Sequence, residues 1–107
     1  MSTDKIANLE KLVGSPRDGA LLRYGLGMEY EKSGDAMRAI EHLQRAVAFD
    51  PAYSAAWSLL GRLYADAGRR DEARQAWTCG IEAAHKRGDK QAEKMMAVFT
   101  KRLEKDT

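Results

Sequence analysis

The residue types that most often carry catalysis or bind metal are sparse in this chain and far apart in the sequence. The histidines are His42 and His85, and the one cysteine is Cys79. Neither histidine has an acid at a spacing that would orient its ring as a general base, and no cluster of Cys and His offers zinc ligands. We interpret Cys79, beside Thr78 and Gly80, as a small buried residue rather than a nucleophile. The sequence therefore predicts no enzyme, no metal site and no cofactor.

Two other patterns could bind charged ligands, and neither is well formed. Gly25 and Gly27 lie inside a helical segment rather than after a strand, so they do not make a phosphate-binding loop. Basic residues concentrate in the last third of the chain, among them Arg69, Arg70, His85, Lys86, Arg87, Lys90, Lys94, Lys101, Arg102 and Lys105. Acids are interspersed with them, whereas a nucleic-acid footprint needs a stripe of one sign. We interpret these cations as favourable charge at helix ends and on solvated faces, so nucleic acid is not the expected partner.

Length and composition are those of one small soluble domain. The chain has 107 residues, of which 44% are hydrophobic and 32% charged, and its net charge is only +2. No segment approaches the roughly 20 apolar residues that span a bilayer, and the N-terminus lacks the apolar run of a signal peptide. A single cysteine fits a reducing compartment. We expect a cytoplasmic protein without membrane contact.

Apolar residues at helical spacing, separated by turn signals, predict six helices and no strand. Ser15, Pro16 and Asp18 have the pattern of a helix start, with a Ser cap, Pro at the first helical position and an acid three residues after the cap. Gly34 and Gly68 have the positions of left-handed caps at helix ends. The expected helices cover residues 3–13, 16–33, 36–50, 51–67, 70–86 and 90–103, with Asp35 and Asp89 as further N-caps. The short connections favour antiparallel packing of neighbouring helices.

One segment of the chain repeats at a fixed spacing. Leu26-Gly27-x-x-Tyr30-x-x-x-Gly34 returns 34 residues later as Leu60-Gly61-x-x-Tyr64-x-x-x-Gly68. A period of this length indicates stacked supersecondary units, which bind partners more often than they catalyse reactions. The residues expected to face inward are Ile40, Leu43, Ala46, Val47, Trp57, Leu60, Tyr64, Ala73, Ala76, Trp77 and Ile81.

These residues resemble the tetratricopeptide repeat family, whose 34-residue unit has the pattern W-x-x-L-G-x-x-Y…A-x-x-x-F…P. The second unit supplies Trp57, Leu60, Gly61, Tyr64, Ala73 and Trp77, and the first supplies Leu26, Gly27, Tyr30, Ala39, Leu43 and Pro51. The departures are Arg23 in place of Trp, Leu43 in place of an aromatic residue, and His85 in place of the second Pro. Since that Pro is missing, we expect the regular array to stop near His85.

The resemblance implies an all-α solenoid of antiparallel helix pairs, wound as a right-handed superhelix. We expect a single domain in four parts: an N-terminal capping helix at 3–13, a first repeat at 16–51, a second repeat at 52–87 and a C-terminal capping helix at 89–105. Capping helices are expected because each unit needs a neighbour to cover its apolar side. The Met start and the polar C-terminus favour an entire small protein.

In this family the first helix of each repeat lines a concave groove that commonly binds peptides or protein segments. The positions carried over by alignment are Leu21, Tyr24, Met28, Glu31, Ser58, Arg62, Met96 and Phe99. Methionine and aromatic side chains there suit an adaptable apolar contact, and Arg62 would pair with an acidic group. Met96 and Phe99 could equally be core residues, whereas we expect Met95 and Leu103 to be core.

The sequence argues against one well-known ligand of the family, the acidic C-terminal tails of chaperones. The clamp that holds them needs asparagines in the groove, where this chain has Met28 and Arg62. A protein or peptide partner of unknown identity remains the leading hypothesis. The alternatives are self-association through apolar surface on the terminal helices, giving a monomer or weak homodimer, and binding of RNA or an acidic partner through the basic last third.

Overall fold

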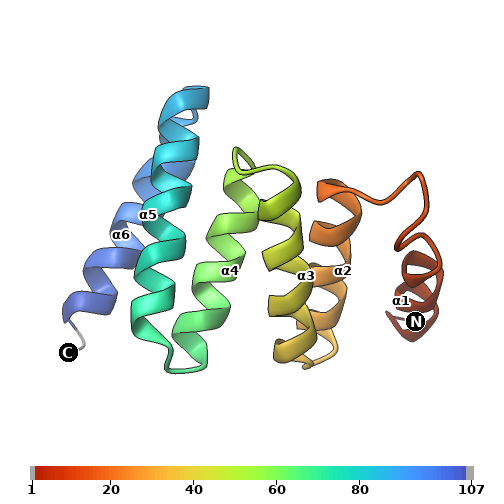
Figure 1. The fold of residues 1–107 in the computed structure, drawn as a ribbon. Helices are drawn as coiled ribbons and strands as arrows, with labels where there is room; N and C mark the ends of the chain where they lie inside the picture. The colour runs from red at the N-terminus through yellow and green to blue at the C-terminus, as the bar shows by residue number, and fades with distance from the viewer. Residues whose placement is uncertain (1, 106–107) are drawn as a thin grey trace. The chain divides into compact units, whose positions relative to one another are not determined.

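The computed structural model describes residues 2–105, and every regular element in that range is an α-helix. The helices are α1 (Ser2–Glu10), α2 (Ala20–Lys32), α3 (Ala36–Phe49), α4 (Ser54–Asp66), α5 (Arg70–Arg87) and α6 (Lys90–Lys105) (Figure 1). The predicted all-α fold with six helices is therefore confirmed for the described residues. The helices fall into two compact units, the first ending at Asp50 and the second beginning at Pro51.

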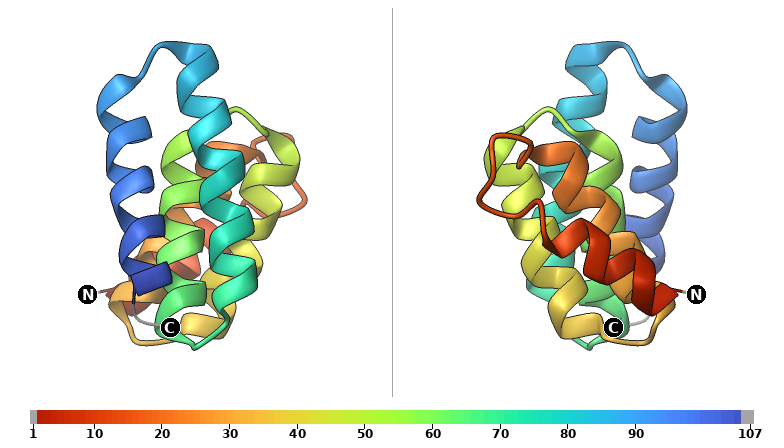
Figure 2. Two further views of the ribbon diagram at one scale, coloured as in Figure 1. Left: turned by 90° about the vertical axis from the view of Figure 1, so that its left-hand side faces the viewer. Right: turned by 90° about the vertical axis from the view of Figure 1, so that its right-hand side faces the viewer.

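In the first unit, α2 and α3 form a closely packed antiparallel pair, and α1 lies against α2 (Figure 2). The pair is held by buried apolar residues at helical spacing, chiefly Leu26 on α2 and Ile40, Leu43 and Val47 on α3. Gly27 allows the close approach, because a Cβ atom there would lie 2.7 Å from Cγ of Leu43. This is the role that the repeat pattern predicts for this glycine.

In the second unit, α5 packs on both α4 and α6, with Ala73, Ala76 and Trp77 buried along α5. A Cβ atom on Gly61 of α4 would overlap the indole of Trp77, so the two helices meet where the glycine leaves room. The indole nitrogen of Trp77 donates a hydrogen bond to the carbonyl of Ser58 at 3.1 Å, which satisfies the one polar atom of that side chain.

Most of the predicted helix ends are confirmed, because their signals are local. The carboxylate of Asp35 accepts from the backbone N–H of Arg38, and that of Asp89 from Ala92, each at 3.1 Å. Both are N-caps that satisfy donors the helix leaves unpaired. Gly34 and Gly68 end their helices with φ of 84° and 77°, the left-handed region that other residues adopt only at a cost.

The predicted start of the second helix is wrong: α2 begins at Ala20, not at Pro16. Ser15 to Asp18 form a turn instead, in which the Ser15 hydroxyl donates to the carbonyl of Leu12 at 2.6 Å. Gly19 follows with φ 173°, an extended conformation that a helix cannot include. The Asp18 carboxylate accepts from the backbone of Gly14, so it closes the turn rather than supporting a helix N-terminus.

Two predictions about burial are also wrong. Met95, expected in the core, is 46% exposed, because α6 packs on α5 along the line through Met96 and Leu103, and Met95 lies about 100° around the helix from Met96. Cys79, expected to be buried, is exposed, since it lies on the outer side of α5, next to the buried Gly80. Leu103 is buried as predicted.

Candidate functional site

One face of α2 carries the first four predicted binding residues. Leu21, Tyr24, Met28 and Glu31 follow one another at spacings of three or four, so they share one side of the helix. Leu21 is 77% exposed, a large value for an apolar side chain, and the other three are half-buried. The opposite side of α2 carries the buried Leu26, so this face is what the first unit leaves uncovered.

The equivalent face of α4 is smaller in side-chain volume. Its residues are Ala55, Ser58, Arg62 and Ala65, each 34 positions after its counterpart on α2. Arg62 is exposed, and Ser58 and Ala65 are half-buried. The backbone at Ser58 is fixed by the hydrogen bond from Trp77, so this face rests on the packed pair of α4 and α5.

The two predicted binding residues on α6 are placed differently. Met96 is fully buried, and a Cβ atom on Gly80 of α5 would meet its sulfur. The ring of Phe99 lies half-buried against Trp77, with centroids 5.5 Å apart and planes tilted by 42°. Met96 is therefore a core residue of the second unit, and Phe99 packs beside it.

The displacement of Met96 has a simple cause in the length of α5. The starts of α2 and α4, Ala20 and Ser54, are 34 residues apart, whereas those of α4 and α6 are 36 apart. α5 has 18 residues against 14 in α3, because it continues through His85, where the repeat would have Pro, and ends only at Gly88.

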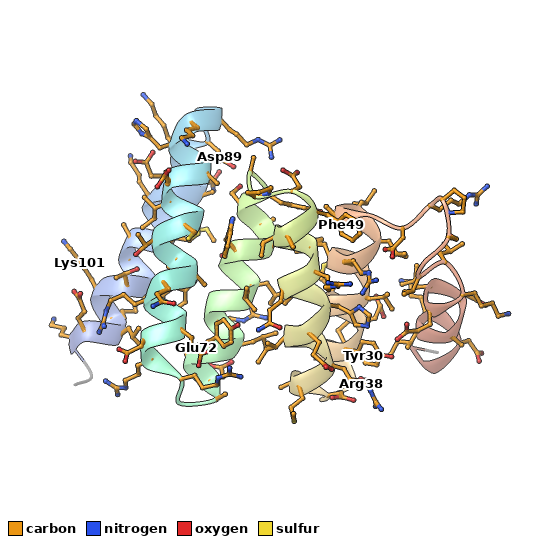
Figure 3. The ribbon with its side chains drawn as sticks, viewed as in Figure 1. Tyr30, Arg38, Phe49, Glu72, Asp89 and Lys101 are labelled. Carbon is orange, nitrogen blue, oxygen red and sulfur yellow. The ribbon has the colours of Figure 1, made fainter. Side chains whose placement is uncertain are left out.

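With a spacing of 36, Met96 takes the place of the buried Leu60, and the exposures of the two residues agree. The positions Ala55, Ser58, Arg62 and Ala65 of α4 then correspond on α6 to Gln91, Lys94, Val98 and Lys101. All four are exposed, and Figure 3 shows Lys101 on the outer side of α6. The sequence signal that could have located these exposed residues is the helix stop at Gly88 and Asp89. It lies further along the chain than a 34-residue repeat would place it.

Arg23, which stands where the repeat pattern has Trp, lies at the centre of a polar network in the first unit. Its guanidinium donates from Nε and Nη2 to the two carboxylate oxygens of Asp18, both at 2.9 Å, and from Nη1 to Nδ1 of His42 at 3.3 Å. This arrangement explains how a nearly buried arginine replaces the aromatic residue. The pKa of Asp18 is held well below its usual value, first by the hydrogen bond from Arg23 and then by the one from Gly14.

The same network continues to α1 through Glu10. Nε2 of His42 lies 3.4 Å from Oε2 of Glu10, and the hydroxyl of Tyr30 donates to that oxygen at 2.5 Å. The rings of Tyr30 and His42 stack with centroids 5.4 Å apart. The hydrogen bond to Glu10 raises the pKa of Tyr30 to about 12. The network ties α1, α2 and α3 together, which is a structural role for residues that the sequence left unexplained.

The remaining candidates for chemistry do not converge on a site. His85 is exposed and lies 3.4 Å from the carboxylate of Glu93, the last helix's first-turn acid. Both histidines thus have an acidic neighbour in space that the sequence spacing did not reveal. Within residues 2–105 there is no group of three or more acids, histidines or cysteines placed to hold a metal ion. No helix in the described part of the chain is long and apolar enough to cross a membrane.

Similarity to known proteins bears on what these faces do. The sequence pattern of the tetratricopeptide repeat matches residues 31–97. The chain is 53% identical to TPR repeat-containing protein PA0015 of Pseudomonas aeruginosa over 94% of its own length and 95% of that protein's. It is also similar in structure to protein BPP2914 of Bordetella parapertussis, with 40% identity, a TM-score of 0.79 and coverage of 94% and 88% of the two chains.

A more distant structure has the same fold. The Sgt2 TPR domain of Aspergillus fumigatus matches with 28% identity and a TM-score of 0.82, over 98% of this chain and 69% of that one. Proteins of this family are in general non-catalytic modules for interaction with other proteins. The chain belongs to the tetratricopeptide repeat family, as its helix pairs, its repeated glycine contacts and these similarities show.

Proposed function

We propose that the chain is a non-catalytic interaction module that binds a peptide or protein segment on the exposed faces of its first repeat helices. The observation that carries the proposal is the face of α2, where Leu21 is 77% exposed and is followed by Tyr24, Met28 and Glu31. An apolar side chain that the fold leaves in water gains free energy when a partner covers it. Tyr24 and Met28 add contact area with adaptable shape.

The α4 face, taken by itself, offers a partner a charge and a close backbone approach. Arg62 can donate several hydrogen bonds to a carboxylate, while Ala55 and Ala65 leave room for the ligand's main chain. The same residues argue against the chaperone tail clamp, which needs asparagine at the positions of Met28 and Arg62. We propose that the module acts in the cytoplasm, where an exposed single cysteine such as Cys79 is stable as a thiol.

The test is affinity capture from a lysate of the source cells with three baits: wild type, Leu21→Ser and Met37→Ser. Met37 is the matched control, because its exposed fraction of 78% nearly equals the 77% of Leu21. It lies on α3, outside the proposed face. Wild type and Met37→Ser should recover the same partner, and Leu21→Ser should lose most of it. Equal recovery by all three baits, or loss with Met37→Ser alone, would refute this binding face.

Self-association is the second candidate, and the exposure of Met95 and Val98 on α6 favours it. A copy packed there would bury both side chains. The charges on α6 oppose self-association, because Val98 is surrounded by Lys94, Lys101 and Arg102. Two such faces would bring like charges together. Sedimentation velocity across a wide concentration range separates the candidates, since a strict monomer at the highest concentration excludes self-association.

A further inference from the structure

The exposed side of α6 carries a cluster of cations that the proposed function does not use. Lys94, Val98, Lys101, Arg102 and Lys105 recur at spacings that place them on one side of the helix, here termed the α6 face. All five are exposed, and Val98 is 45% exposed. The last four of them, with Glu104, line a shallow depression on the surface.

The positive charge of the α6 face is not neutralised within the described part of the chain. Several cations elsewhere are paired: Arg38 with Asp35 at 3.0 Å, Arg69 with Glu72 at 2.6 Å, and Lys86 with Glu82 at 3.3 Å. None of Lys94, Lys101, Arg102 and Lys105 forms an ion pair with a described residue. The one acid at the rim, Glu104, has Arg74 at 3.9 Å as a partner. Unpaired charge of one sign around an apolar residue complements a ligand of the opposite sign.

The position of the α6 face links it to the binding residues of α4. Counted from the helix starts, Lys94 and Val98 correspond to Ser58 and Arg62, which the proposed function places against the ligand. The sequence alone assigned Met96 and Phe99 to this part of the groove and made it apolar. The structure buries Met96 and exposes Lys94, Val98 and Lys101 instead, so the chemistry at this end of the second unit is basic.

We propose that the α6 face binds an acidic segment of a partner protein, with carboxylates on both sides of one apolar residue. The inference rests on the proposed function, because it names the chemistry of the same ligand. From Lys94 to Lys105 the helix rises about 16 Å, which about five extended residues would span. Val98 supplies the apolar contact between the cations. A nucleic acid fits less well, because the α6 face has no aromatic side chain on which bases could stack.

Fluorescence anisotropy tests the proposal with a labelled peptide in which one leucine is flanked on each side by glutamates. The counterpart with glutamines reports binding that does not depend on charge. The protein variants are Lys94→Glu/Lys101→Glu and the control Lys11→Glu/Arg45→Glu, which makes the same change in net charge at exposed positions of the first unit. Circular dichroism verifies that each variant is folded, and Lys94→Gln/Lys101→Gln replaces the first if it is not.

We expect the affinity for the glutamate peptide to fall about tenfold or more in the α6 variant, and by less than about twofold in the control. The glutamine peptide should bind far more weakly to wild type. Equal weakening by both variants, equal binding of both peptides, or no binding of the glutamate peptide would overturn the proposal. Tighter binding of a labelled uridine oligonucleotide, lost in the α6 variant, would overturn the ligand class.

The proposed function and this inference can fail separately. If the partner captured by wild type is still recovered by Lys94→Glu/Lys101→Glu but lost by Leu21→Ser, the interaction module stands and the acidic ligand is refuted. If the glutamate peptide binds the α6 face while Leu21→Ser recovers every partner, the α2 face is refuted instead.

Discussion

At the scale of single residues, the fold depends on glycines that act by lacking a side chain. Gly61 and Gly25 make a matched pair, because both lie inside a helix, but only Gly61 faces a neighbour that a Cβ would overlap. Gly61→Ala should lower the free energy of unfolding by about 1–3 kcal/mol through overpacking against Trp77. Gly25→Ala should raise it by up to about 1 kcal/mol through helix propensity. Urea unfolding decides the matter, and stabilisation by both changes would be inconsistent with close α4–α5 packing.

The pair of Asp18 and Arg23 predicts a dependence of stability on acid. The folded-state pKa of Asp18 lies below its unfolded value, so the ionised carboxylate stabilises the fold above that unfolded value, and the contribution is lost as pH falls toward the folded pKa. Asp18→Asn should thus be less stable than wild type at pH 7, with the difference shrinking below about pH 4. The measurement is the free energy of unfolding in urea for wild type and Asp18→Asn, once at pH 7 and once below about pH 4. A difference that stays constant would show that the carboxylate's charge is not involved.

The raised pKa of Tyr30 predicts a loss of stability in alkali rather than in acid. Its pKa is raised to about 12 by the hydrogen bond to Glu10, so the protonated phenol stabilises the fold below the unfolded pKa of about 10, and this is lost as pH rises through 12. Ultraviolet titration should show one of the tyrosines ionising about two pH units late. That late step should disappear in Tyr30→Phe and move to lower pH in Glu10→Gln. Titration of all tyrosines together near pH 10 would contradict the bond.

At the scale of elements, the register of α6 is open to a direct test with neighbouring methionines. Met96 is fully buried and Met95 is 46% exposed. Met96→Ala should cost about 2–5 kcal/mol, because it leaves a cavity beside Gly80. Met95→Ala should change stability by less than about 0.5 kcal/mol. Equal losses on denaturant unfolding, or the reverse order, would mean that α6 is rotated from the position described.

The elements also show which features the sequence could predict. The helix pairs, their glycine contacts and the caps at Asp35 and Asp89 depend on residues a few positions apart or one period apart, and all were predicted. The start of α2 was not, because the Ser-Pro-Arg-Asp pattern is satisfied equally by a turn that Gly19 ends. The exposed face of α6 was predicted at the wrong residues, because its register depends on the length of α5. A prediction from a fixed 34-residue period assumes that this length does not change.

Contacts between residues distant in sequence were the hardest to predict. Glu10, Arg23 and His42 lie on three different helices, and only packing brings them together. The departure of Arg23 from the family pattern was visible, but its partners were not. In contrast, the four candidate positions on α2 follow from a helical spacing and a repeat alone, and they share one exposed or half-buried face.

At the scale of the whole molecule, charge is distributed unevenly along the chain. Residues 1–50 have 7 basic and 8 acidic side chains, whereas residues 51–107 have 11 basic and 8 acidic. The small net charge of +2 therefore hides a basic second unit. An acidic segment that contacts α6 would match the positive charge of this unit.

Site-specific photocrosslinking in source cells is the sharpest test of a protein-binding face on α2, because the crosslink forms with whatever protein occupies that face. A photoreactive phenylalanine analogue is placed at Tyr24 on the proposed face or at Met37, which is 78% exposed on α3. We expect a discrete adduct with another protein from position 24 and none from position 37. Adducts from position 37 alone, or no adduct from position 24, would contradict the assignment of a protein-binding face to α2.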